Sequence, residues 1–210
     1  MAIEIPTDLT PELVPLSWLL GTWEGMGRLG EGEVDDEYFL QRVQFANDGL
    51  PHLQYRSESW LTQEDGTVLR PLAVEMGFWQ LERDQVEGDA GPGMVPGDVV
   101  PTLRTAADVE KYRSDDGFRI QASIVHPGGL NELYRGTING PRIQLETDRV
   151  LRAAGAKEYT QATRMYGLVN GELFWRWDSA GAGGSLTAHA SAVLKKLDGA
   201  ATNDGADGSA

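Results

Sequence analysis

The chain has 210 residues, with 18 Lys and Arg against 32 Asp and Glu, a formal net charge of −14 and a sequence pI near 4.5. A domain of this length buries enough surface to fold without disulfides or a structural metal. The absence of cysteine excludes thiolate catalysis, zinc fingers and iron–sulfur clusters, and the acidic balance argues against binding to nucleic acid or anionic membranes. No stretch approaches the roughly 20 apolar residues of a spanning helix. The N-terminal segment is acidic where a signal peptide is basic, so we expect a cytoplasmic protein.

The first element in chain order is a short N-terminal helix. Thr10 is a candidate N-cap, Pro11 suits the first helical position, and Gly21 suits the residue that follows the helix. The apolar residues of the segment form one stripe, made of Leu13, Leu16, Leu19 and Leu20. We expect this stripe to lie against the core of the domain.

Short segments in which apolar and polar residues alternate follow the helix and predict β-strands. In one of them, Phe118, Ile120 and Ile124 alternate with polar residues, so one face of the strand is expected to be buried. The predicted strands are a first one opened by Trp23, then Glu37–Phe45, His52–Trp60, Leu72–Leu81, Phe118–His126, Leu130–Ile138, Arg142–Thr147, Tyr159–Val169, Glu172–Asp178 and Leu186–Leu197.

Tight turns join several of these strands. The residues that tolerate positive φ are Asn47-Asp48-Gly49, Asp65-Gly66, Asn139-Gly140 and Asn170-Gly171. About ten strands in sequential hairpins exceed what a flat sheet comfortably holds, and closure removes the sheet edges. The sequence therefore predicts an all-β fold, an up-and-down antiparallel β-barrel of about ten strands, which can hold one small apolar ligand.

Two segments interrupt the strand pattern. The segment Glu82–Gly117 is rich in Gly, Pro and acidic residues, and we interpret it as an insertion over the barrel surface with a short helix at Thr105–Arg113. The tail Asp198–Ala210 contains mostly Gly, Ala, Asp and Ser and is expected to be disordered. Residues 1–197 are therefore expected to form a single barrel domain.

The residues do not support hydrolysis or phosphate binding. No Gly-x-Ser-x-Gly elbow accompanies the histidines, and the Gly-rich runs lack the context of a P-loop. The three histidines are His52, His126 and His189, and their spacing does not place two of them on one helix or strand face. Judged from the residues alone, a lone His189 among alanines is more often a packed barrel residue than a ligand.

The first predicted strand carries a small-x-aromatic-x-small pattern made of Gly21, Trp23, Gly25 and Gly27. The aromatic ring can plug one end of a barrel, while the glycines permit close approach of a neighbouring strand or a planar ligand. For Trp23 itself, structural closure of the barrel is the favoured interpretation.

Three motifs in this order resemble the nitrobindin family, haem-binding relatives of the fatty-acid-binding-protein barrel. The segment Gly21–Gly27 matches the family pattern Gly-x-Trp-x-Gly-x-Gly. The runs His126–Leu133 and Ala156-Lys157-Glu158 resemble a strand pair and a strand start of the bacterial members. The run Leu186–Leu194 is similar to the closing strand whose histidine ligates haem iron. The resemblance covers about residues 13–81 and 117–197.

The resemblance implies one ferric haem b per subunit, with His189 as the axial iron ligand. Lys157 is a candidate partner of a haem propionate, and a solvated surface lysine explains it almost as well. His126 is a candidate residue of the distal side or the pocket rim, but a loop histidine is the favoured interpretation. The implied chemistry is binding of nitric oxide and isomerisation of peroxynitrite to nitrate, with neither nucleic acid nor membrane as a partner. A homodimer is left open.

One segment departs from the family pattern, because Glu31-Gly32-Glu33-Val34 stands where nitrobindins carry Tyr-Pro-Thr-Ile beside the haem.

Two alternatives to the haem-binding function stay open. One is a non-catalytic carrier of a fatty acid or another apolar ligand, with Arg164 or Arg176 as the carboxylate anchor, although ordinary surface charge also explains both arginines. The other is a haem-free scaffold whose insertion binds another protein. Core packing is sufficient to explain Trp175 and Trp177.

Overall fold

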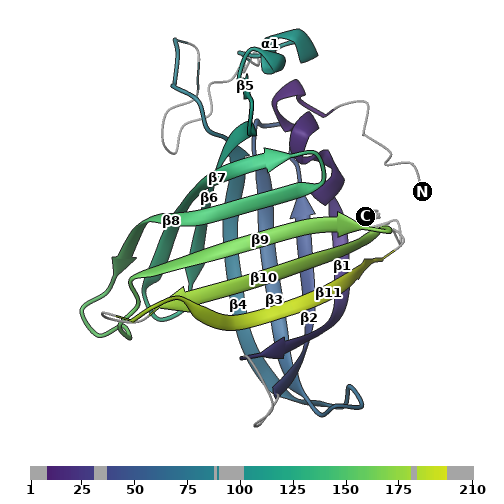
Figure 1. The fold of residues 1–210 in the computed structure, drawn as a ribbon, viewed down its shortest axis with the longest axis vertical. Helices are drawn as coiled ribbons and strands as arrows, with labels where there is room; N and C mark the ends of the chain where they lie inside the picture. The colour runs from purple at the N-terminus through teal and green to yellow at the C-terminus, as the bar shows by residue number, and fades with distance from the viewer. Residues whose placement is uncertain (1–8, 31–36, 88, 90–101, 181–183, 198–210) are drawn as a thin grey trace, which may run out of the picture.

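The protein is a closed antiparallel β-barrel with a short helix at one end (Figure 1). The computed structural model describes residues 9–30, 37–87, 89, 102–180 and 184–197. The barrel strands are β1 (Gly21–Leu29), β2 (Glu37–Ala46), β3 (Leu53–Thr62), β4 (Val68–Leu81), β6 (Gly117–His126), β7 (Leu130–Asn139), β8 (Arg142–Arg152), β9 (Gln161–Val169), β10 (Glu172–Ala180) and β11 (Thr187–Lys196).

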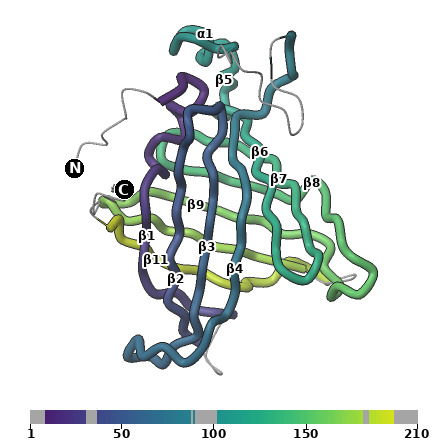
Figure 2. The backbone as a smooth tube through the Cα atoms, turned by 180° about the vertical axis from the view of Figure 1, so that it is seen from behind, coloured from purple at the N-terminus to yellow at the C-terminus, as the bar shows by residue number. Residues whose placement is uncertain are grey.

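Each barrel strand pairs with the next one along the chain, β4 pairs with β6, and β11 returns to pair with β1. The two-residue β5 (Arg113–Ser114) adds only a short pairing to β6. Seen from behind, β1 to β4 run upright while β9 crosses behind them (Figure 2). The predicted up-and-down barrel is therefore confirmed. Within the described ranges, no helix is long and apolar enough to cross a lipid bilayer.

The hairpins follow the turn chemistry of the sequence. Val169 pairs with Glu172, and both loop residues between them have positive φ, 53° at Asn170 and 85° at Gly171. This is the geometry of a two-residue type I′ turn. The loop from β7 to β8 is Gly140-Pro141, one residue later than predicted, because Asn139 is already paired with Arg142.

The N-terminal helix differs from the prediction in type and at both ends. It is a 3₁₀-helix, η1 (Pro11–Leu19), which contains Pro15, and the side chain of Thr10 makes no capping hydrogen bond. Gly21 does not terminate the helix, since it already pairs with Phe45 in β1, at a φ of 115°. The predicted apolar stripe is confirmed, because Leu13, Leu16 and Leu19 are fully buried in the core and the partly buried Leu20 packs against it.

The glycine motif packs β1 closely between its neighbours. Trp23 is 2% exposed, and its Nε1 donates a hydrogen bond to the carbonyl of Leu19 at 2.7 Å, which closes the barrel beneath η1. A Cβ on Gly27 would lie 2.6 Å from the carbonyl oxygen of Ser191 and would also overlap the Phe39 ring. Only glycine lets the strands approach this closely.

The described part of the insertion packs on the same end of the barrel. Its helix, α1 (Ala106–Glu110), is shorter than predicted, and Val109 joins the hydrophobic core. The side chain of Arg83 is 9% exposed and bridges Glu12 of η1, at 2.8 Å, and Asp89, at 2.6 Å. The insertion is thus tied to η1 as well as to the barrel. The predicted disordered tail lies outside the described residues.

Candidate functional site

The barrel interior contains a cavity of about 420 Å³ near the C-terminal end of β1, away from Trp23. Seven strands line it: β1 to β4 and β9 to β11. Phe39, Trp175 and Trp177 provide aromatic walls, while His189 and Arg164 are polar residues on the wall formed by β9 and β11. An apolar cavity with a few convergent polar groups is the usual form of a ligand site.

His189 reaches this cavity because β11 is irregular. Alternation along β11 buries Ala190, Ala192 and Leu194, whereas His189 is exposed, so a regular strand would turn His189 away from the cavity. The register to β10 shifts here, however, because Trp177 pairs with Ala190 and Asp178 pairs with Ala188. His189 is therefore the extra residue of a β-bulge, a device that redirects a side chain. Its ring lies edge-on to Trp177, with centroids 4.4 Å apart.

The surroundings of His189 suit a metal-bound planar group. Burial lowers the pKa of His189 below 6.5, the nearby Arg164 lowers it further, and Glu75 opposes the shift. The imidazole is consequently neutral at pH 7, the form that binds a metal ion. Ala188 and Ala190, both of which line the cavity beside it, are small enough to let a flat macrocycle approach. The donor and the space beside it therefore fit an axially ligated haem.

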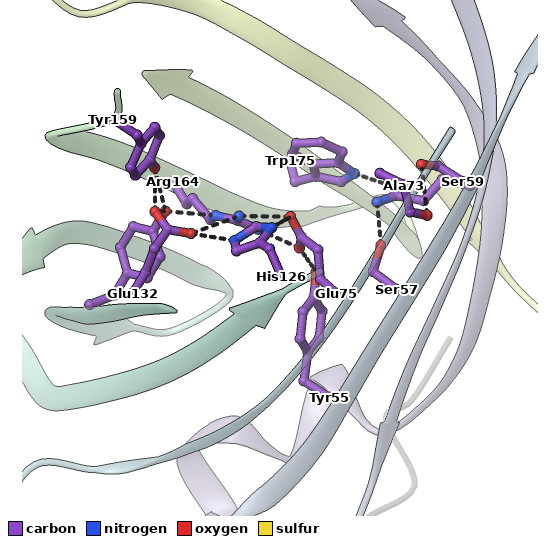
Figure 3. A network of polar contacts seen from close by, with 12 residues as sticks. Tyr55, Ser57, Ser59, Ala73, Glu75, His126, Glu132, Tyr159, Arg164 and Trp175 are labelled. Atoms are coloured by element: carbon purple, nitrogen blue, oxygen red, sulfur yellow. Dashed lines mark hydrogen bonds and ion pairs between the residues drawn. The ribbon is translucent and has the colours of Figure 1, made fainter. Parts of the chain in front are cut away.

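A buried ion cluster lies against the cavity, made of Glu75 from β4, Glu132 from β7 and Arg164 from β9 (Figure 3). Arg164 is 3% exposed and donates hydrogen bonds to both carboxylate oxygens of Glu75, at 2.8 and 2.9 Å. Its Nη2 lies 3.6 Å from Oε2 of Glu132. Burial opposes ionisation of Glu75, but the guanidinium outweighs it and lowers the pKa to about 2. Glu75 is thus ionised at neutral pH.

Three tyrosines complete the hydrogen bonding of the two carboxylates. Tyr55 donates to Glu75 at 2.8 Å, and Tyr134 donates to Glu132 at 2.5 Å. Tyr159 also donates to Glu132. Burial raises the pKa of each of these phenols, and the adjacent carboxylates raise it further. The phenols therefore stay protonated and act as donors.

His126 belongs to this polar cluster. Its Nε2 lies 2.6 Å from Oε2 of Glu132, and its Nδ1 lies 3.6 Å from Oε1 of Glu75. Its ring stacks on Trp177 at a centroid distance of 6.2 Å. Sequence analysis favoured a loop histidine and kept a distal or rim position as the alternative. His126 is the last residue of β6, paired with Leu130, and is not among the residues that line the cavity. It lies behind Trp177, close to the ion cluster.

The other predicted site residues occupy different places. Lys157 is exposed in the loop before β9, where its carbonyl accepts a hydrogen bond from Arg152 at 2.7 Å. Two residues later, the ring of Tyr159 lies 6.5 Å from that of Trp177, so the loop passes beside the wall that carries His189. The four residues of the glycine motif do not line the cavity. The segment 31–34, which departs from the family pattern, lies outside the described residues.

The arginines proposed as lipid anchors are engaged elsewhere. Arg164 is buried as such an anchor must be, but Glu75 already occupies its guanidinium. Arg176 is exposed and donates to Asp178 at 2.7 Å. A fatty-acid carboxylate would have to displace a carboxylate of the protein itself, which makes the carrier interpretation the weaker one.

Sequence analysis missed Glu75 and Glu132. Glu132 had a usable signal, because it shares a clearly alternating face with Leu130, Tyr134 and Ile138, and a charge at an inward position must find a buried partner. Glu75 had none. Its strand is apolar on both faces, and the structure buries the face with Glu75 and Trp79 while it exposes Met76 and Phe78.

The fold and cavity define a closed β-barrel with an interior cavity that could accept a planar apolar group beside an imidazole. Consistent with this class, the family model described as "THAP4-like, heme-binding beta-barrel domain" matches residues 12–196. The chain belongs to this haem-binding family, the nitrobindin family, so haem is its cofactor.

Individual relatives agree with the family. A protein of Renibacterium salmoninarum named "Peroxynitrite isomerase" is 66% identical, over 93% of this chain and 94% of its own length. One of the same name from Arthrobacter sp. is 64% identical, over 94% of this chain and all of its own length. The crystal structure of Rv2717c from M. tuberculosis covers 91% of this chain and 100% of its own, with a TM-score of 0.64 and 27% identity.

Proposed function

We propose that this protein is a peroxynitrite isomerase that binds one ferric haem b per subunit, with His189 as the axial ligand. The observation that carries the proposal is the β-bulge of β11, which turns a neutral imidazole into an apolar cavity. The names of the relatives that are 66% and 64% identical support the reaction.

When bound, the haem would supply an iron centre for the chemistry of peroxynitrite and nitric oxide. The chain supplies the setting for this chemistry. His189 provides the lone pair, and the aromatic side chains of Phe39 and Trp175 form apolar walls that exclude water. Conversion of peroxynitrite to nitrate conserves every atom and the charge, so the chain needs neither a proton donor nor a reductant. Lys157 is assigned to a haem propionate, since its loop passes beside the cavity.

The test is a titration of the purified protein with ferric haem, followed by the Soret band. Wild type and His52→Ala are expected to bind haem stoichiometrically, because His52 lies against Phe78 and does not line the cavity. His189→Ala is expected to lose the shifted Soret band. Lys157→Ala should bind haem only slightly more weakly, since an exposed ion pair contributes about 1 kcal/mol or less.

Stopped-flow decay of peroxynitrite, with quantification of nitrate, then tests the reaction. Haem-loaded wild type should accelerate decay and yield nitrate, while His189→Ala should not. A Soret band unchanged by His189→Ala would overturn the assignment of the ligand. Binding of a fluorescent fatty acid by a colourless protein that takes up no haem would favour the carrier instead.

We also propose a cytoplasmic homodimer. The absence of cysteine is compatible with a reducing compartment. Support for the dimer comes from apolar side chains on the outer face of paired strands β4 and β6, where Met76, Phe78 and Val125 are 55%, 53% and 50% exposed. Sedimentation of wild type and Phe78→Ser tests the interface. A monomeric wild type would refute the dimer.

A further inference from the structure

Trp177 of β10 is the aromatic side chain that contacts the axial histidine. The two residues lie at the same β-bulge, since Trp177 pairs with Ala190, the neighbour of His189. Their rings meet edge to face, at a centroid distance of 4.4 Å and an interplanar angle of 71°. Both side chains line the cavity. The indole therefore limits the orientations that the imidazole can adopt.

Such a limit matters because the bulge fixes the backbone of His189, whose carbonyl accepts a hydrogen bond from the N–H of Gly30 at 2.9 Å, but does not fix the rotation of its ring. An axial ligand nevertheless has to present one ring nitrogen to the metal, and its orientation is normally held by a neighbouring group. Among the described residues, Trp177 makes the ring contact that can serve this purpose.

Trp177 is held in turn by the ion cluster. The guanidinium of Arg164 lies 4.5 Å from the Trp177 ring centroid, within the range of a cation–π contact. His126 stacks on the same indole, with an interplanar angle of 22°. Arg164 is itself fixed by its two hydrogen bonds to Glu75 and is 3% exposed. A continuous set of contacts thus connects Glu75 to His189.

We propose that Trp177 is a positioning residue for His189, and that Arg164, clamped by Glu75, holds Trp177 in place. The inference rests on the proposed haem ligation by His189, but the contact itself exists in the haem-free protein and can be measured there. Sequence analysis treated Trp177 as core packing, which accounts for its burial but not for its contact with the ligand.

The experiment uses Trp177→Leu, the conservative Trp177→Phe, Arg164→Lys and the control Trp79→Phe. Trp79 is fully buried but does not line the cavity, so its substitution reports general destabilisation. Two quantities are measured for each variant that folds: the NMR chemical shifts of the His189 ring protons in haem-free protein, which the ring current of the contacting indole displaces, and the Kd for ferric haem. Loss of groups that orient a metal ligand typically weakens binding by about 10- to 100-fold.

Trp177→Leu is expected to remove the ring-current displacement of the His189 ring protons, since the indole lies 4.4 Å from the imidazole, and to weaken haem binding about 10-fold or more. Trp177→Phe should keep most of the chemical-shift displacement and most of the haem affinity. Arg164→Lys should lose less of each than Trp177→Leu does, and Trp79→Phe should match wild type in both. Wild-type values for both quantities in Trp177→Leu would overturn the inference while ligation by His189 stands. Wild-type values in Arg164→Lys would overturn the role of the clamp. If wild type binds no haem, the proposed function fails, and the His189 ring-proton shifts in haem-free protein still decide whether Trp177 holds the imidazole.

Discussion

Replacement of Glu75 by Gln tests the ion cluster most directly. The substitution preserves the size of the side chain but removes the charge that neutralises Arg164, which is left with Glu132 at 3.6 Å. Breaking a buried ion pair by removing one partner costs about 3 to 5 kcal/mol. We therefore expect Glu75→Gln to lower the free energy of unfolding at pH 7 by about 3 kcal/mol or more.

The pH dependence of the free energy of unfolding gives a second expected value for Glu75. The pKa of Glu75 falls from 4.5 to about 2 in the folded protein. Because the folded pKa is the lower one, ionised Glu75 stabilises the fold above pH 4.5 and this contribution is lost as the pH falls toward 2. Its size is about 3 kcal/mol, because each tenfold change in proton affinity corresponds to about 1.4 kcal/mol. Wild type should therefore lose about 3 kcal/mol more than Glu75→Gln over that interval.

Urea unfolding, followed by tryptophan fluorescence at pH 7, 5 and 2, measures both effects. The control is Glu24→Gln, whose partner Arg42 lies 2.6 Å away but is 51% exposed, so its loss should cost less than about 1 kcal/mol. If Glu75→Gln unfolds at the same urea concentration as Glu24→Gln at pH 7, the reasoning about the buried cluster is refuted.

Three further predictions concern other parts of the molecule. In thermal unfolding, Gly27→Ala should destabilise the barrel by about 1 to 3 kcal/mol through overpacking. The control Gly155→Ala, at a position with open space around it, should stay within about 0.5 kcal/mol of wild type. Arg83→Ala should lower the free energy of unfolding by about 3 kcal/mol and speed amide hydrogen exchange in η1. Unchanged exchange in η1 would contradict the role of Arg83 in connecting the insertion to this helix. Because burial lowers the pKa of His189 from its usual value, haem affinity should be nearly constant from pH 8 to 7 and fall as the pH drops further; a fall between pH 8 and 7 in a haem titration would contradict a neutral imidazole.

Much of the architecture was predictable because it depends on local chemistry. Alternation with a period of two residues locates the strands, and Asn170-Gly171 accepts the positive φ of a two-residue turn. Local signals were less reliable at element ends. Thr10 and Gly21 have the right residue types for helix caps, yet Pro15 lies inside a 3₁₀-helix and Gly21 is already paired in β1.

The sequence by itself determined the class of fold, the closure of the barrel and, through a motif, the histidine to examine. Only the tertiary structure decided which way His189 faces, because a bulge depends on the register between β10 and β11, and register is a property of two strands together. The same holds for Glu75, Glu132 and Arg164, which lie on three strands far apart in the chain. Their charges meet only when the barrel closes, since no local pattern encodes which partner a buried charge will find.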